Sequence, residues 1–256
     1  MSDLLISRVA HVQIAEINRP PHNYFTKELM TLIAEALIAA DADPDIRVTL
    51  VCANGKSFCA GADFSGPQPE TPEARRADSR ALYNEGIRIF RAQKPIVAAV
   101  QGHAIGGGLG VALAADYRVA TPETSFSANF TRLGFHPGFG LTVTLPELVG
   151  KARASLLMLT GRRVKGEEAY RVGLCEALVP AGKLRDEAMK LAQEIAQSAP
   201  LAVKSTRATL RAGLAERVEE QLKHELDEQM WLRETEDFAE GVRANAERRV
   251  ANFQAR

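Results

Sequence analysis

Short apolar runs of strand length recur along the first half of the chain and alternate with segments of helical spacing. The apolar runs are Val48 to Cys52, Pro95 to Val100 and Tyr117 to Ala120. The helical segments begin after Thr26, at Ala81 and at Gly106. Strands that are apolar along their whole length are buried on both faces of a sheet, and the helices between them cover those faces. The alternation therefore predicts an α/β fold.

The pattern changes near residue 200, where long charged helices replace the alternation. Val218, Leu222, Leu226 and Met230 repeat there at helical spacing, which predicts a helix with one apolar face. Such a face needs a partner, either the core or another subunit. The sequence therefore predicts a core over residues 1–199 and a helical C-terminal region over residues 200–256.

The segment from Phe64 to Arg80 contains glycine and several prolines between charged residues. This composition predicts a loop. Loops of this length beside a glycine-rich turn often close over a site as lids, and a plain surface loop is the alternative interpretation.

The charge balance and the cysteines argue against several classes of function. Lys plus Arg equals Asp plus Glu at 32 each, so net charge does not favour binding to nucleic acid or to an anionic membrane. Cys52, Cys59 and Cys175 form no CxxC pair, and we expect neither a disulfide framework nor a metal. A signal-peptide layout and a membrane-spanning apolar run are both missing. A reduced, cytoplasmic location is the simplest expectation.

Two turns rich in small residues carry the strongest indication of function. Ser57 to Asp63 reads SFCAGAD, and Lys94 to Leu109 reads KPIVAAVQGHAIGGGL. Each turn follows an apolar run, and its small residues let the backbone approach a ligand closely. The N–H groups at the start of the following helix lack partners within that helix and can point at an oxyanion. A glycine triplet taken alone is also explained by tight packing of a helix on a strand.

Taken together, the two turns resemble the crotonase (enoyl-CoA hydratase/isomerase) family. The likeness continues through further motifs that cover nearly the whole chain. These motifs are Ala114 to Ala120, Leu133 to Gly140, Leu145 to Gly150, Leu159 to Gly161, Ala169 to Val179 and Glu240 to Ala244.

The resemblance implies a spiral of ββα repeats, followed by C-terminal helices that assemble a homotrimer or a homohexamer. It implies an acyl-CoA thioester as ligand and no cofactor beyond the coenzyme A of that substrate. The family's oxyanion hole uses two backbone N–H groups to hold the thioester carbonyl as it becomes enolate-like, and by position these belong to Ala62 and Gly107. The implied contacts to CoA and substrate fall on Ala60, Asp63, Phe64, Ser65 and Gly106.

The family's two hydratase glutamates are absent from their positions in this chain. In the family these glutamates activate water and protonate the α-carbon, which is general acid–base chemistry. By position the first is Gly110 and the second is Phe130. Neither residue can transfer a proton, so the resemblance implies an acyl-CoA enzyme that is not a standard two-glutamate hydratase.

One hypothesis is another reaction on the same enolate platform with a different base. Isomerisation, decarboxylation, dehalogenation and C–C hydrolysis are reactions of this kind. His136 is the preferred base, because it lies in the turn that carries an acid in isomerases of the family and its pKa suits proton transfer near neutral pH. Packing of His136 against the turn is the alternative. Asp63, His103 and Tyr83 are the other candidates.

Two further hypotheses need no protein base. In one, Gly110 leaves a space for water or for a small anion such as bicarbonate, and Phe130 forms an apolar wall for the substrate. In the other, the chain binds acyl-CoA without turning it over.

Two features outside the turns have open interpretations. Cys59 beside the first turn is either a nucleophile or a small buried side chain. Lys204, Arg207 and Arg211 share one helix face, which either meets CoA phosphates across a subunit boundary or faces solvent.

Overall fold

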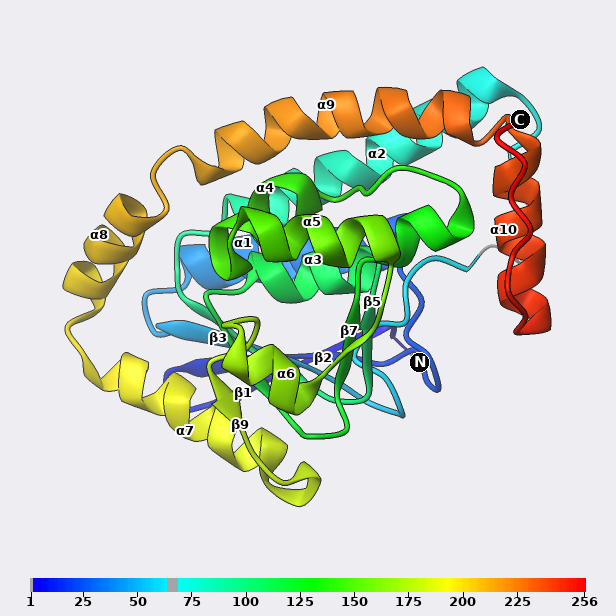
Figure 1. The fold of residues 1–256 in the computed structure, drawn as a ribbon. Helices are drawn as coiled ribbons and strands as arrows, with labels where there is room; N and C mark the ends of the chain where they lie inside the picture. The colour runs from blue at the N-terminus through cyan, green and yellow to red at the C-terminus, as the bar shows by residue number, and fades with distance from the viewer. Residues whose placement is uncertain (1, 64–68) are drawn as a thin grey trace.

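A six-stranded sheet forms the centre of the protein, whose computed structural model describes residues 2–63 and 69–256 (Figure 1). The strands of this sheet lie in the order β1-β2-β3-β4-β6-β9, and a second sheet has the order β5-β7-β8. The strands are β1 (Leu4–Val9), β2 (Val12–Ile17), β3 (Val48–Ala53), β4 (Ile96–Val100), β5 (His103–Ile105), β6 (Tyr117–Ala120), β7 (Ser125–Ser127), β8 (Val164–Lys165) and β9 (Ala177–Leu178).

The helices pack around these sheets. They are α1 (Lys27–Ala42), α2 (Pro72–Phe90), α3 (Gly107–Ala114), α4 (Leu141–Val149), α5 (Lys151–Thr160), α6 (Gly166–Arg171), α7 (Leu184–Gln197), α8 (Pro200–Leu210), α9 (Leu214–Leu232) and α10 (Glu236–Glu247), with 3-10 turns η1 (Asn129–Leu133) and η2 (Ala181–Lys183). Figure 1 shows α7 on one side of the large sheet and α1 and α3 on the other.

The predicted buried strands are confirmed. Every residue of β3 and of β4 is buried. One face of the sheet packs on α7 through Leu184, Ala188, Ala192 and Ala196, and the other face belongs to the main core beneath α1 and α3. Coverage of both faces explains why these strands carry no polar alternation.

Strands that follow each other in the chain belong to different sheets, β4 and β6 to the large sheet and β5 and β7 to the small one. This alternation gives the chain its spiral path. β4 and β6 pair in parallel within the large sheet, while β5 and β7 pair in parallel within the small one. The chain enters α3 after β4 and β5, and it enters η1 and α4 after β6 and β7. The α/β fold and its ββα repeat are therefore as the sequence predicted.

The beginning of α2 corrects one interpretation of the sequence. We expected a loop over residues 64–80, but the helix already begins at Pro72. Thr71 caps it, since its hydroxyl accepts a 3.2 Å bond from the N–H of Ala74. Proline suits the first helical position because the N–H that it lacks has no partner there.

The C-terminal region consists of three helices, and α9 lies alongside α2 for much of its length (Figure 1). Ion pairs join these two helices, Arg76 with Asp227 and Arg91 with Glu219, the latter at 2.6 Å. Val218, Leu222 and Leu226 are buried against the core. The apolar face predicted in this region therefore has a partner within its own chain.

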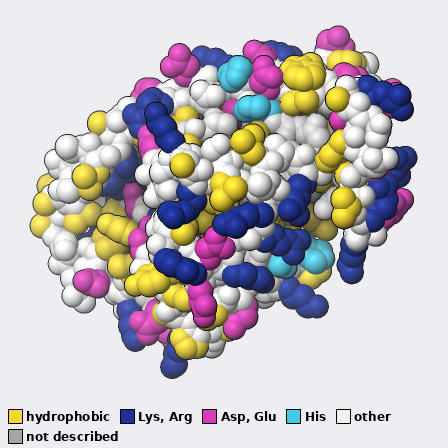
Figure 2. All heavy atoms as spheres, viewed as in Figure 1, with side chains coloured by type: hydrophobic (Ala, Val, Ile, Leu, Met, Phe, Trp, Pro, Cys, Tyr) yellow, Lys and Arg dark blue, Asp and Glu magenta, His cyan; other side chains and the backbone are white. Residues whose placement is uncertain are grey.

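Charges of both signs cover the surface. Figure 2 shows lysine and arginine side chains interspersed with acidic ones over the viewed face, with apolar groups between them. This distribution agrees with the equal numbers of acidic and basic residues.

Candidate functional site

The two turns singled out in the sequence lie against each other. Cys59 forms a parallel bridge with Ala104, and its N–H donates to the carbonyl of His103 at 2.9 Å. The N–H of Ile105 donates back to the carbonyl of Cys59 at 3.0 Å. Any side chain on Gly108 would collide with that carbonyl. The glycine triplet therefore serves the close approach of α3 to the first turn.

Asn23 fixes the shape of the first turn through hydrogen bonds to the backbone. Its side chain is fully buried and donates 2.7 Å bonds to the carbonyls of Asn54 and Ser57. Two buried bonds to the backbone hold the turn in one conformation, because leaving either carbonyl unpaired costs about 1–3 kcal/mol.

Each turn presents one accessible backbone donor. Gly107 is the first residue of α3, so its N–H has no partner within the helix. Ala62 pairs with Phe25 in a parallel bridge in which the N–H of Phe25 bonds the carbonyl of Gly61 at 2.9 Å. This pattern directs the Ala62 N–H away from the partner segment. Ala62 is exposed and Gly107 is half-buried.

The remaining residues expected to contact CoA or substrate surround these donors. Ala60 is half-buried, and its N–H donates to the carbonyl of His22 at 3.0 Å. Gly106 is buried, and its N–H donates to the carbonyl of Ser127 at 2.8 Å, with a backbone φ of 55°. Asp63 is exposed. Phe64 and Ser65 lie outside the described residues.

Phe139 takes the volume beside Gly110. A Cβ on Gly110 would stand 2.5 Å from Cδ1 of the Phe139 ring. The ring is 1% exposed and packs edge-on against Phe25, with 5.0 Å between ring centroids. The hypothesis of a space for water or bicarbonate beside Gly110 is therefore wrong. The turn from Leu133 to Gly140 gave the one sequence signal for this packing, an aromatic residue set between two glycines.

Phe130 forms an aromatic wall next to the second turn. It lies in η1 and is 7% exposed. A Cβ on Gly106 would lie 3.7 Å from Cζ of its ring. The Phe130 and Phe135 rings meet edge to face at 5.3 Å. Gly110 and Phe130, the positions at which the resemblance leads us to expect the family's glutamates, therefore both lie against apolar rings.

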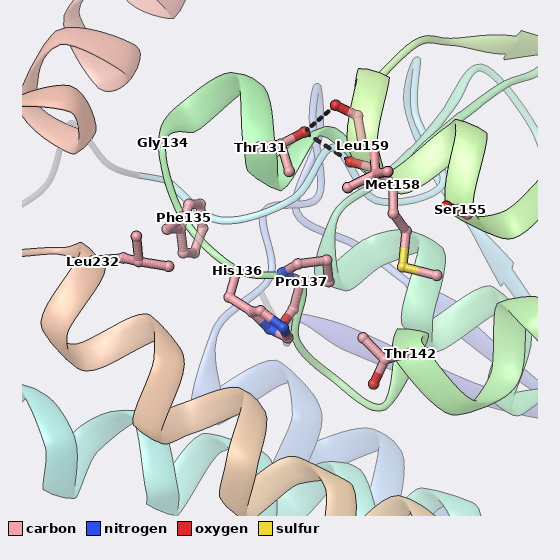
Figure 3. A pocket seen from close by; sticks show the side chains of 10 residues that line it. All are labelled: Thr131, Gly134, Phe135, His136, Pro137, Thr142, Ser155, Met158, Leu159 and Leu232. Carbon is pink, nitrogen blue, oxygen red and sulfur yellow. Dashed lines mark hydrogen bonds between the residues drawn. The ribbon is translucent and has the colours of Figure 1, made fainter. Parts of the chain in front are cut away.

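His136 lies in a cavity of about 440 Å³ beside the Pro137 turn (Figure 3). Its Nδ1 is 2.7 Å from the carbonyl of Pro137, an acceptor that fixes the proton on Nδ1 and leaves Nε2 unprotonated in the neutral ring. Figure 3 shows the ring pointing into the space that Thr142 and Met158 border. Neither Ala62 nor Gly107 lines this cavity. Within the described residues, the preferred base therefore lies in a cavity whose lining includes neither backbone donor.

A hydrogen-bonded chain ties the Pro137 turn to α2 and α9. The Tyr83 hydroxyl donates to Oε1 of Gln229 at 2.7 Å, and Nε2 of Gln229 donates to the carbonyl of His136 at 2.8 Å. Burial raises the pKa of Tyr83. A phenol in this state is a poor base near neutral pH, so the position of Tyr83 favours support of the turn over proton transfer.

Burial shifts the pKa of two other candidate groups, Cys59 and His103. Burial raises the pKa of the Cys59 thiol to about 12, which keeps the sulfur protonated and argues against a nucleophile. Burial lowers the pKa of His103, and the nearby Arg163 and Lys165 lower it further. His103 is therefore neutral at physiological pH.

Two arginines of the basic face predicted on residues 204–211 form ion pairs within the protein. Asp116 accepts from Nε of Arg207 at 2.8 Å and from Nη1 of Arg211 at 3.1 Å. The interpretation of this face as solvated is wrong for both arginines, which are 8% and 16% exposed in their side chains.

Two kinds of feature are absent from the described residues, a metal-binding cluster and a membrane-spanning helix. No group of three or more histidine, cysteine, aspartate or glutamate side chains within residues 2–63 and 69–256 is placed to hold a metal ion. None of the helices in the described part of the chain combines the length and apolarity of a membrane span.

Comparison with known proteins identifies the family. The model of the enoyl-CoA hydratase/isomerase family matches residues 7–256. A crotonyl-CoA hydratase of Syntrophomonas wolfei is 33% identical over 255 residues, covering 98% of this chain and 97% of the relative. A 2,3-dehydroadipyl-CoA hydratase of Escherichia coli is 32% identical over the full length of both proteins.

Solved structures share the fold. An enoyl-CoA hydratase/isomerase of Pseudoalteromonas atlantica matches with a TM-score of 0.87 at 32% identity, covering 99% of this chain and 100% of that one. An enoyl-CoA hydratase of Mycobacterium avium matches with a TM-score of 0.85 at 29% identity, covering 99% of each chain. The architecture is therefore that of the crotonase fold. The chain belongs to the enoyl-CoA hydratase/isomerase family, whose members act on acyl-CoA thioesters.

Proposed function

We propose that this protein binds an acyl-CoA thioester and stabilises its enolate between the N–H groups of Ala62 and Gly107. The observation that carries the proposal is the meeting of the two turns, which leaves one accessible donor on each. Two preorganised N–H groups stabilise negative charge that develops on a carbonyl oxygen, and removal of one such donor typically costs about 3–4 kcal/mol of transition-state stabilisation. The chemistry needs no cofactor beyond the coenzyme A of the substrate.

We propose further that the protein does not hydrate enoyl-CoA by the two-glutamate route, although relatives are named as hydratases. Hydration requires an acid and a base near the α- and β-carbons. Phe139 fills the volume beside Gly110, and Phe130 occupies the other position. Isomerisation, decarboxylation and C–C hydrolysis remain the candidate reactions, with acyl-CoA binding without turnover as the alternative.

Decarboxylation is favoured within this set by one observation, the apolar enclosure of both positions. Loss of CO2 from a carboxylate on the α-carbon leaves the enolate directly, so no protein base has to remove a proton. Aromatic walls solvate a localised carboxylate poorly, while the two backbone donors stabilise the delocalised enolate that follows.

The deciding experiment measures turnover and binding together. Purified protein is mixed with crotonyl-CoA while the conjugated enoyl absorbance is followed, and calorimetry measures binding of the same ligand. We expect binding with very slow or absent hydration. Efficient hydration that survives substitution of His136 and Asp63 would overturn the mechanistic proposal. Failure to bind any acyl-CoA would overturn the assignment of the ligand.

A screen of acyl-CoA thioesters then separates the candidate reactions. Loss of CO2 from a malonyl-type thioester would support decarboxylation, and movement of a double bond would support isomerisation. Tight binding of all thioesters without any product would support the non-catalytic alternative.

Self-association is part of the same proposal. Leu201 and Leu210 on α8 are 82% and 80% exposed, and Figure 2 shows apolar side chains gathered at the α8 end of the molecule. Leu159 on α5 is also largely exposed. We expect a homotrimer or a homohexamer in a cytoplasmic setting, which light scattering after gel filtration would test. A monomer at micromolar concentration would contradict the oligomeric part alone.

A further inference from the structure

Arg233 directly follows α9 and is a half-buried cation that has no ionic partner among the residues that the structure describes. Among the residues that the structure describes, no carboxylate lies within 4 Å of its guanidinium, and its Nε has no hydrogen-bond partner. The undescribed residues 64–68 contain no aspartate or glutamate. Burial lowers the pKa of Arg233, and the nearby Arg75 lowers it further, while Tyr83 and Asp78 oppose this change.

Two nearby arginines, Arg75 and Arg76, differ from Arg233 because each has a carboxylate partner. Arg75 pairs with Glu234 at 2.6 Å, and Arg76 pairs with Asp227. Both pairs join the same ends of α2 and α9. An unpaired cation in a partly desolvated place is costly unless something else neutralises it.

An aromatic wall connects Arg233 with the proposed oxyanion hole. The guanidinium carbon lies 5.7 Å from the centroid of the Phe135 ring. Phe135 meets Phe130 at 5.3 Å, and the Phe130 ring tip reaches within 3.7 Å of the position of a Cβ on Gly106. Figure 3 shows Phe135 beside Leu232, the residue that precedes Arg233. The wall thus starts next to Gly107 and ends at a positive charge.

We propose that Arg233 binds a free carboxylate at the far end of the acyl chain, so that the substrates are CoA thioesters of dicarboxylic acids. The inference rests on the proposed acyl-CoA function. The thioester carbonyl would lie at Ala62 and Gly107, the methylene chain would lie along Phe130 and Phe135, and the terminal carboxylate would pair with the guanidinium. Arginine suits this role because its planar fork matches the two oxygens of a carboxylate.

A purely structural role for Arg233 makes a different prediction. A cation at the C-terminal end of α9 interacts favourably with the helix dipole, and the contact with Phe135 adds a cation–π term. Both effects stabilise the fold, and neither distinguishes one acyl chain from another. Ligand preference therefore separates the two roles.

The experiment compares thioesters matched in length. Calorimetry measures the binding of adipyl-CoA against hexanoyl-CoA, and of suberyl-CoA against octanoyl-CoA, to the full-length protein. We expect the wild type to bind at least one of the two thioesters with a terminal carboxylate about tenfold or more tightly than the neutral thioester of the same length. A hydrogen bond to a charged group contributes a difference in affinity of this size. Arg233→Gln should lose this preference and keep the affinity for the neutral thioester. Arg233→Lys should keep part of it.

Arg76→Gln is the matched control, because Arg76 is a nearby cation that already has a carboxylate partner. It should leave the preference unchanged. If wild type binds both members of each pair equally, the inference fails while the acyl-CoA function stands. If no thioester binds, the proposed function fails and this inference falls with it. The wild-type comparison decides the matter even if Arg233→Gln does not fold.

Discussion

The Phe139 ring lies between two glycines of neighbouring helices. Side chains on Gly86 of α2 and on Gly110 of α3 would both collide with it. Phe139 itself has a backbone φ of 58°, an uncommon value for a residue other than glycine. The ring is therefore confined between α2 and α3, and the conformational freedom that it loses is compensated by its nearly complete burial.

This packing predicts the effect of a single methyl group. Alanine favours a helix over glycine by about 1 kcal/mol. At Gly110 that gain is outweighed, because overpacking a filled core costs about 1–3 kcal/mol and the new Cβ would lie 2.5 Å from the buried Phe139 ring. We expect Gly110→Ala to destabilise the protein in urea unfolding. Gly182→Ala is the control, since a Cβ there meets nothing within 4 Å.

A double variant checks the cause. Phe139→Ala alone leaves a cavity and also destabilises. If the two side chains compete for one volume, the effects of Gly110→Ala and Phe139→Ala will not add, because alanine lacks the Cδ1 and Cγ that the new Cβ would meet. Strict additivity would show that Phe139 is not the obstacle.

At the scale of elements, regular patterns were predictable and tight packing was not. β3 and β4 follow from their continuous apolar sequence, and Thr26 caps α1 as its sequence indicates, accepting from the N–H of Leu29. The first turns of α2 were missed because the prolines before Thr71 outweighed the helix start at Pro72. Close contacts such as Phe139 on Gly110 depend on the meeting of distant segments, which local periodicity does not encode.

The same limit applies to the site. The paired turns were predictable because their motif is local, and the comparisons confirm the family. Arg233 and Glu225 are ordinary charged residues on a helix when only the sequence is read. Their burial becomes visible only once α9 lies along α2 and over the start of α4.

Glu225 makes the attachment of α9 sensitive to pH. Its carboxylate accepts from the N–H of Gly140 at 2.9 Å and from the hydroxyl of Thr142 at 2.5 Å, at the start of α4. Burial raises the pKa of Glu225 from 4.5 to about 7, against the opposing effect of these hydrogen bonds. Between those values the unfolded chain releases a proton that the folded protein keeps. Stability contributed by this group is therefore full below pH 4.5 and is lost as pH rises through 7.

Urea unfolding of wild type and Glu225→Gln between pH 4.5 and 8 tests this. The raised pKa of Glu225 corresponds to a loss of about 3 kcal/mol in the free energy of unfolding across this pH range. We expect the free energy of unfolding of the wild type to fall with pH relative to that of Glu225→Gln, which has no proton to release. Parallel curves for the two proteins would contradict a raised pKa at Glu225.

At the scale of the whole molecule, one aspartate joins the C-terminal helices to the centre of the sheet. Asp116 accepts from the N–H of Ile96 on β4 at 2.8 Å and pairs with Arg207 and Arg211 of α8. Arg211 also donates to the carbonyl of Ala114, the last residue of α3. The helix whose first N–H faces the proposed ligand is thus anchored at its other end by the C-terminal region.

Removal of the negative charge should leave two buried cations without compensation. We expect Asp116→Asn to lower the free energy of unfolding by about 3–5 kcal/mol, the usual cost of breaking a buried ion pair from one side. Arg256→Gln breaks the pair with Glu236, in which both side chains are about 70% exposed, and should change little. If the anchor also aligns α3, Asp116→Asn will weaken acyl-CoA binding under conditions in which the protein remains folded. Unchanged affinity in the folded variant would confine Asp116 to stability.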